Sequence, residues 1–369
     1  MIVKELKFPF YAKAIFFFIG LIAIVAIAYF ARSILIPLVF ATIIAIVLHP
    51  VVNFFIRRRI NRVIAIIITL FLIILLIVAF GGFIFSQASR FSESWPLLVE
   101  KFTGILNDTI TWAAGYFDID PVRIHEWIAK TKSELLHISS AAIGHTLISV
   151  GSFLIALFLI PFYIFLILFY QPLILDFIRR VFAASHQSQV SEIVTQIKTT
   201  IQHYLIGLII EAAMVATMNS IALLILGIDY AILLGIIGAL LNVIPYIGGI
   251  VAVALPMMIA IATKSTAWYA VWVLASYYFI QLIDNHYIVP YIVASKVRIN
   301  ALFSIIVVLV GNAIWGIPGM FLSIPLLAIV KLIFDHVEPL KPWGFLLGDT
   351  MPPILKIKLI IKKIKKESA

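Results

Sequence analysis

Six runs of predominantly apolar residues, each 17 to 25 residues long, divide this chain of 369 residues. At 1.5 Å per residue, a helix of that length crosses the hydrocarbon core of a bilayer, which is about 30 Å thick. The runs are too uniformly apolar for the alternating strands of a membrane barrel. We therefore predict membrane-spanning α-helices at Ala14–Phe30, Ile34–Phe55, Val63–Phe85, Thr146–Phe169, Tyr204–Ile228 and Trp268–Ile292.

The composition excludes a water-soluble protein. Only 12% of the residues are charged, whereas a soluble domain has roughly 25%. The net charge of +10 does not indicate nucleic-acid binding, because the basic residues stand mostly at the ends of apolar runs and in the tail, where they set membrane topology. There is no cysteine, so disulfides and thiolate ligands are excluded. We predict no metal site and no cofactor.

Two further apolar segments, Tyr230–Ala262 and Ala301–Phe334, are too long for one crossing. Their 33 and 34 residues would measure about 50 Å as straight helices. Helix-breaking residues interrupt each segment near its middle, and half-segments of about 13 residues are too short to cross alone. Re-entrant hairpins fit these lengths better, with tilted and kinked spans as the alternative. The breaks read Asn242-Val-Ile-Pro245-Tyr-Ile-Gly248-Gly249 and Gly311-Asn312-Ala-Ile-Trp315-Gly316-Ile-Pro318-Gly319.

The basic residues predict the orientation. Lysines precede the first span, and four arginines between residues 57 and 62 follow the second. Both groups belong on the cytoplasmic side, so the N-terminus is expected to be cytoplasmic. Residues 87–145 then fall outside and 171–203 inside. Counting basic residues favours the hairpins by one charge, and either reading places the lysine-rich tail inside.

This reading divides the chain into five regions. Residues 1–86 hold three spans, 87–145 form an extracytoplasmic excursion, and 146–203 hold the fourth span and a cytoplasmic amphipathic linker. Residues 204–336 form the transport core, and 337–369 form a basic cytoplasmic tail. In the core, a span followed by a broken segment occurs twice, which predicts an inverted repeat of the kind that builds secondary transporters. The excursion is expected to hold two amphipathic helices, the second opening at Asp120-Pro121.

The polar residues inside the apolar runs gather in the second half of the chain. Ionisable residues in hydrocarbon are costly, so each needs a reason. Glu211 can be a proton carrier or a structural hydrogen-bonding group, and Asp284 with Asn285 can bind a cation or simply lie at the interface. His49, before Pro50, is expected to be an interfacial histidine. The residues predicted to form the substrate or ion pathway are Glu211, Asn242, Pro245, Gly248, Gly249, Gln281, Asp284, Asn285, Asn312, Gly316 and Gly319.

The breaks offer a second kind of chemistry. Unwound backbone exposes carbonyl groups that can coordinate a cation, and helix N-termini that favour anions. No P-loop, HExxH, GxSxG or dinucleotide-binding fingerprint is present. We therefore predict a protein that is not an enzyme and draws on an ion gradient.

Taken together, these motifs resemble those of the autoinducer-2 exporter family, also called PerM-like permeases. The resemblance is carried by the first break, by Gln281-Leu-Ile-Asp284-Asn285 with Pro290, and by Trp315-Gly316-Ile-Pro-Gly319 with Pro325. It implies a multi-pass transporter of the bacterial inner membrane that forms a homo-oligomer, expected to be a pentamer. The family often has His-Pro where this chain has Asn300-Ala301, and a second Gly in place of Asn312, so the substrate can differ.

The expected function is ion-coupled secondary transport. The resemblance implies export of a small polar metabolite such as autoinducer-2, or exchange of sodium for protons. The expected partners are the lipid bilayer and a small-molecule or monovalent-cation substrate, with no nucleic acid. An oligomeric ion channel and a structural membrane scaffold remain as alternatives, separated from a transporter by whether flux occurs and whether it saturates.

Overall fold

The computed structural model describes residues 9–117, 158–244, 248–264, 266–293 and 299–350. Regular structure in these ranges is entirely helical, which confirms the all-α prediction. Five of the described helices are long and apolar enough to cross a membrane, so the protein is a multi-pass membrane protein. The main helices are α1 (Phe10–Phe30), α2 (Arg32–Arg57), α3 (Arg62–Phe117), Phe158–Val181, α5 (Gln187–Ile225), α6 (Ala231–Asn242), α7 (Gly248–Thr263), α8 (Trp268–Ile283), η2 (Asp284–Val293), α9 (Ala301–Trp315), α10 (Ile317–His336) and α11 (Lys341–Leu347).

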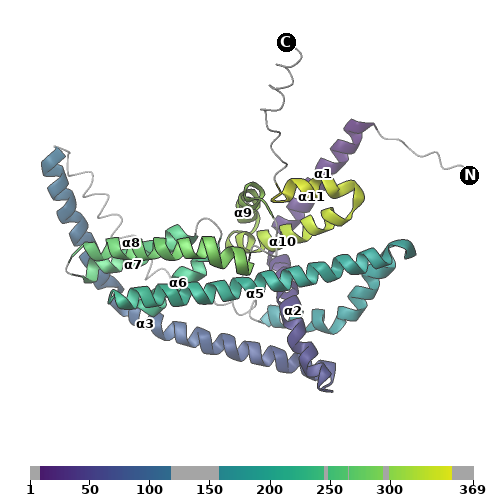
Figure 1. Ribbon diagram of the computed structural model, residues 1–369, viewed down its shortest axis with the longest axis horizontal. Helices are drawn as coiled ribbons and strands as arrows, with labels where there is room; N and C mark the ends of the chain where they lie inside the picture. The colour runs from purple at the N-terminus through teal and green to yellow at the C-terminus, as the bar shows by residue number, and fades with distance from the viewer. Residues whose placement is uncertain (1–8, 118–157, 245–247, 265, 294–298, 351–369) are drawn as a thin grey trace, which may run out of the picture.

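The third span continues further than the sequence analysis expected. Helix α3 runs for 56 residues to Phe117, so no helix boundary falls at residues 86–87. The polar residues that follow the span include no helix breaker before Pro96, and one interior proline bends a helix without ending it. Figure 1 shows α3 changing direction in its last part. The helix expected from Asp120 lies outside the described residues.

The region expected to be a cytoplasmic linker consists of the ends of two helices. The helix Phe158–Val181 and α5 meet at a short turn that includes a 3-10 turn at Ala184–His186. Helix α5 then runs for 39 residues. A helix of that length measures about 58 Å, so it extends beyond the hydrocarbon core.

Both broken segments fold back on themselves. Helix α6 packs against α7, and α9 packs against α10. The breaks fall where the sequence predicted them, after Asn242 and at Gly316, where a φ of +66° is a conformation that glycine adopts without strain. The sequence analysis expected half-segments too short to cross a membrane alone. In the second hairpin α10 differs from this expectation, since it has 20 residues and is long enough to cross. The break at Gly316 lies near the middle of the segment, and α10 is the longer arm because its helix continues beyond Phe334 to His336.

The second hairpin is tight because its facing residues are small. A Cβ at Gly311 would lie 2.5 Å from the carbonyl oxygen of Gly319. Ser323 donates to the carbonyl oxygens of Val307 and Gly319 at 2.8 and 2.6 Å. Small residues that let two helices approach closely are the usual means of helix association in lipid.

Helix α5 and the continuous α8–η2 helix pack side by side in antiparallel directions (Figure 1). Gly207, early in α5, lies against the backbone of Ile292, late in η2. Asn219, later in α5, lines the same cavity as Tyr277 of α8. The first hairpin follows α5 and the second follows η2, which is the chain order that an inverted repeat requires.

Three apolar clusters hold the described bundle together. One joins the end of α5 to α6, α7 and α8, and another joins α2, α3 and the helix Phe158–Val181. The third joins α2, α5, η2 and α10. Large apolar side chains on the outer faces stay exposed, as Ile22 and Phe30 of α1 are at 66% and 82%. Such faces are stable against lipid and unfavourable in water.

Candidate functional site

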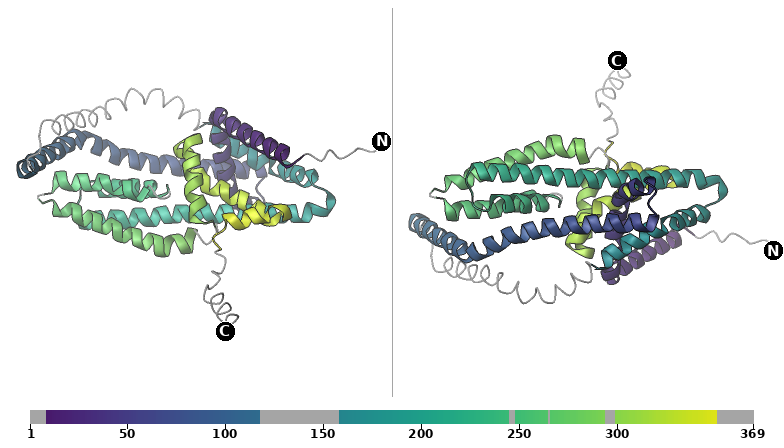
Figure 2. Two further views of the ribbon diagram at one scale, coloured as in Figure 1. Left: turned by 90° about the horizontal axis from the view of Figure 1, so that it is seen from above. Right: turned by 90° about the horizontal axis from the view of Figure 1, so that it is seen from below.

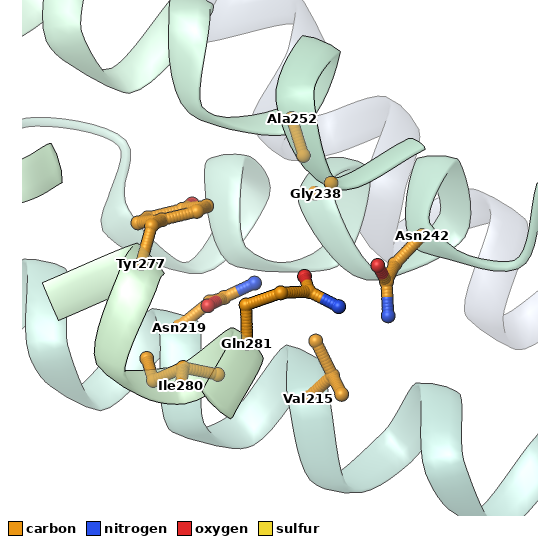
Figure 3. Close-up of a pocket in the computed structure, with 9 residues that line it drawn as sticks. Val215, Asn219, Gly238, Asn242, Ala252, Tyr277, Ile280 and Gln281 are labelled. Carbon is orange, nitrogen blue, oxygen red and sulfur yellow. The ribbon is translucent and has the colours of Figure 1, made fainter. Parts of the chain in front are cut away.

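A small cavity lies where α5, α6, α7 and α8 meet (Figure 3). Its volume is about 10 Å³, which is space for about one water molecule. Polar side chains from three of these helices face it, although the surrounding bundle is apolar. The lining residues are Val215, Asn219, Gly238, Asn242, Gly249, Ala252, Tyr277, Ile280 and Gln281.

Asp284 lies next to this cavity and is 1% exposed. Its Oδ2 accepts hydrogen bonds from Asn242 Nδ2 at 2.9 Å and from Gln281 Nε2 at 3.3 Å. The buried Oδ1 has no hydrogen-bond partner among the described residues. Asn242 is the last residue of α6, so the first break places an amide donor directly on the buried carboxylate. We call Asn242, Gln281 and Asp284 the carboxylate–amide group.

The α-helix gives way to a π-helix at Asp284. The π-helical segment covers the ten residues Asp284–Val293 and includes Pro290. Proline has no N–H to donate and crowds the preceding turn, which favours such a departure from α-helical hydrogen bonding. Single π-helical turns are frequent at functional sites. The widened helix therefore begins at the residue whose carboxylate oxygen is unpaired.

Gly249 provides the space that Gln281 occupies. A Cβ at Gly249 would lie 2.8 Å from Gln281 Oε1 and 3.5 Å from Asn242 Oδ1. Figure 3 shows the Gln281 amide extending toward Asn242. Gln281 Nε2 also lies 3.3 Å from the Oδ1 of Asn285, which is exposed. The glycine at the first break therefore leaves room for the amide that contacts Asp284.

Glu211 of α5 is the second buried carboxylate, with 6% of its surface exposed. It lies near enough to Asp284 for the two carboxylates to repel each other when both are charged. Among the described residues, no lysine, arginine or histidine nitrogen lies within 4 Å of either carboxylate. Burying a charge without a partner is costly, so these groups need a proton or a cation.

Two further polar groups face the cavity. The Oδ1 of Asn219 and the hydroxyl of Tyr277 are buried and have no hydrogen-bond partner among the described residues. Gly238 makes room for both, since its Cβ would lie 3.2 Å from Asn219 Nδ2 and 3.3 Å from the Tyr277 hydroxyl. Neither Asn219 nor Tyr277 is among the pathway residues predicted from the sequence. One tyrosine among many aromatic residues in an apolar run carries no signal of its own.

The residues of the second break lie elsewhere. Asn312 is exposed and its carbonyl accepts from the backbone N–H of Gly316, while Gly319 packs against Gly311 inside the hairpin. Gly319 lines a different cavity of about 290 Å³ between α1, α9 and α10, where Trp315 Nε1 donates to the carbonyl of Ala28 at 2.8 Å. The predicted pathway residues therefore separate into a polar set at the first break and a packing set at the second.

Of the other residues predicted at the first break, one serves helix packing and one falls outside the described ranges. Gly248 allows α7 to start close to α6, because its Cβ would lie 2.7 Å from the Cα of Asn242. Pro245 lies outside the described residues. His286, which follows Asn285 in the chain and is not one of the predicted pathway residues, is exposed, and its Nδ1 contacts the carbonyl of Leu282 within its own helix.

These features define a class of protein. A bundle of membrane-crossing helices, two apolar segments broken into hairpins and buried polar groups at one break are typical of a membrane transporter. Residues 18–338 match the family described as AI-2E family transporter, so the chain belongs to this family. The resemblance of the motifs to autoinducer-2 exporters is thereby confirmed, and the role is membrane transport.

Named relatives align with most of the chain. A putative transport protein of Bacillus subtilis, YrrI, is 24% identical over 83% of this chain and 87% of its own length. The AI-2 transport protein TqsA of Escherichia coli is 22% identical over 87% of this chain and 91% of its own length. The putative permease PerM of Escherichia coli is 25% identical over 89% of this chain and 94% of its own length.

Proposed function

We propose that this transporter is a secondary transporter coupled to a monovalent cation or proton gradient. The observation that carries the proposal is the buried Asp284 carboxylate, which has amide donors on one oxygen and no partner on the other. Glu211, the second buried carboxylate, supplies a second group that can hold a proton or cation. No basic residue among those described neutralises either group, so each carboxylate needs a proton or a cation for charge balance, and in this proposal these are the coupled ions.

The proposed mechanism alternates a cation and a proton at these carboxylates. Two nearby carboxylates repel each other when both are charged, so the pair retains a proton in the absence of a cation. A bound cation offsets this repulsion and favours release of the proton. The first hairpin delivers the Asn242 amide to Asp284, and movement of that hairpin would change what the carboxylate can bind. In this proposal the protein lies in the cytoplasmic membrane with both termini inside and works as a homo-oligomer, expected to be a pentamer.

A second candidate is export of a small polar metabolite. The amides of Asn219, Asn242 and Gln281 at one cavity could bind hydroxyl or carbonyl groups, and one relative is named as an AI-2 transport protein. The present cavity holds about one water molecule, so this candidate requires the hairpin to open. The cation reading needs no such enlargement and is the one that we favour.

The test is proton flux in proteoliposomes that contain a trapped pH-sensitive dye, after external addition of sodium, lithium or potassium. Asp284→Asn and Glu211→Gln remove one carboxylate charge each with little change of shape. The matched controls are Asp176→Asn, an exposed residue paired with Arg180, and Glu192→Gln, an exposed residue on the same helix as Glu211.

Cation-dependent flux that saturates, disappears in the two site variants and persists in the two controls would support the proposal. Flux that rises linearly with cation concentration would indicate a channel. Absence of flux with inserted, correctly assembled protein would refute cation–proton exchange and leave metabolite export to be tested with labelled substrate. A scaffold predicts no flux and altered assembly in the site variants.

A further inference from the structure

A second group of polar side chains lies about 20 Å from Glu211 along α5, since Lys198 precedes Glu211 by 13 residues. It is built from α2, α3, the helix Phe158–Val181 and α5. We call it the basic cluster. Its members are His49, Asn53, Arg62, Gln171 and Lys198.

Hydrogen bonds connect His49 with Lys198 and Asn53, and connect Arg62 with Gln171. Lys198 Nζ donates to His49 Nδ1 at 2.8 Å, and Asn53 Nδ2 contacts the same nitrogen at 3.1 Å. Because lysine has no acceptor, His49 Nδ1 must be the acceptor. Gln171 Oε1 accepts from Arg62 Nη2 at 3.2 Å, and Arg62 and Lys198 both lie near enough to His49 for their charges to act on it.

The basic cluster contains more donors than acceptors. The Lys198 ammonium has three donors, and His49 is the partner that the structure shows for it. Arg62 has five donors, and its Nη2 reaches the carbonyl of Leu168 at 2.6 Å as well as Gln171. The Nε of Arg62 is buried without a partner among the described residues. In those same ranges no carboxylate oxygen lies within 4 Å of Arg62 or Lys198.

A role in membrane topology does not require this arrangement. Arg57, Arg58 and Arg59 are exposed at the end of α2, and exposed residues suffice for a positive-inside signal. Arg62 and Lys198 are instead half-buried and hydrogen-bonded to other helices. Two cations held close together repel each other unless a counter-charge is present. The combination of spare donors and uncompensated positive charge indicates an anionic ligand.

We propose that the basic cluster binds a phosphate group, supplied by an anionic phospholipid headgroup or by free phosphate. Arginine and lysine are the usual ligands of phosphate oxygens, and Arg62 Nε with the free hydrogens of Lys198 would donate to them. The positive-inside rule predicts that this end of the bundle is cytoplasmic, where anionic lipids and basic residues attract each other. The exposed arginines of α2 increase the local concentration of anions.

The site joins four helices that belong to different parts of the chain. A bound phosphate would link α3 and the helix Phe158–Val181 to α5, which carries Glu211 further along its length. Occupancy of the basic cluster would therefore stabilise the position of α5 relative to the helices around it. This inference does not rest on cation coupling, because binding is measured without transport.

The experiment is native mass spectrometry of the full chain in a neutral detergent, titrated with phosphatidylglycerol or with phosphatidylcholine. The variants are Lys198→Gln and Arg62→Gln. The control is Arg58→Gln, which removes the same charge at the same end of the bundle from an exposed side chain. A thermal-shift titration with inorganic phosphate forms a second arm, with sodium chloride at equal ionic strength as its reference.

We expect phosphatidylglycerol to bind in preference to phosphatidylcholine, with about five-fold weaker binding in Lys198→Gln and less than two-fold change in Arg58→Gln. If inorganic phosphate raises the melting temperature of the wild type but not of Lys198→Gln, free phosphate is a ligand. Arg62→Gln also loses the bond to Leu168, so Lys198→Gln decides the result if Arg62→Gln does not fold. Equal binding in all variants, or no selective binding of either anion, would overturn the proposal.

Discussion

Gly249→Ala separates the chemistry of the carboxylate–amide group from the packing of the fold. The added Cβ would lie 2.8 Å from Gln281 Oε1, so the amide must move. Because this amide is the far end of a flexible side chain, moving it costs little stability, but it breaks the 3.3 Å contact with Asp284. Hydrogen bonds to a charged group contribute about 1.5–3 kcal/mol, and this long contact belongs at the lower end. Loss of about 1.5 kcal/mol corresponds to about tenfold weaker cation binding.

The assay is the cation concentration that gives half-maximal proton flux in proteoliposomes, measured beside the melting temperature. We expect the half-maximal concentration to rise about tenfold, with a melting temperature close to that of the wild type. The matched control is Gly81→Ala in α3, where a Cβ would meet nothing within 4 Å. An unchanged half-maximal concentration in Gly249→Ala would refute the assignment of Gln281 to the ion site. A large fall in melting temperature would show that Gly249 is required for packing instead.

Three further substitutions test the framework around the site. Gly207→Ala should destabilise the protein by about 1–3 kcal/mol, measured by thermal unfolding, because its Cβ would lie 2.7 Å from the Ile292 carbonyl oxygen, which is backbone and cannot swing away. Asn300→Ala should speed proteolytic release of α11, and unchanged proteolysis would contradict this. The reason is that Asn300 caps α9 by accepting from Phe303 N–H at 3.0 Å and donates to the Leu346 carbonyl at 2.7 Å. Trp315→Phe removes the bond to Ala28 and should increase hydrogen exchange in α1 by a factor that corresponds to about 1 kcal/mol, with α2 as the internal reference.

The class of fold was predictable from the sequence because lipid imposes strong length and polarity requirements. The runs at Ile34–Phe55 and Val63–Phe85 lie within α2 and α3, and the breaks after Asn242 and at Gly316 end α6 and α9. Helix continuation beyond the membrane was not predictable in the same way. Nothing in the hydropathy at Gln87 indicates whether a helix ends or proceeds as an amphipathic helix, and α3 proceeds.

The sequence identified the two buried carboxylates and the amides that contact Asp284, without predicting how they combine. Asp284 and Glu211 stood out because a carboxylate in an apolar run is costly. The contact of Asn242 with Asp284 joins residues 42 positions apart, and only the fold of the first hairpin brings them together. Asn300, a departure from the family pattern, ties the start of α9 to the end of α11 through the carbonyls of Leu346 and Gly348.

The two hairpins show how one backbone design serves two purposes. Each is a broken apolar segment with glycines at the turn, and each follows one member of the antiparallel pair formed by α5 and α8–η2. In the first hairpin, Asn242 faces a buried carboxylate and glycines leave space for polar side chains. In the second, the small residues are used for close helix packing and the neighbouring cavity is apolar. A similar backbone path in both hairpins does not by itself make an ion site, which also needs charged and amide side chains that lie close together. The chemistry of this transporter is therefore expected at the first break, and substitutions at the second should act through stability and movement of the hairpin.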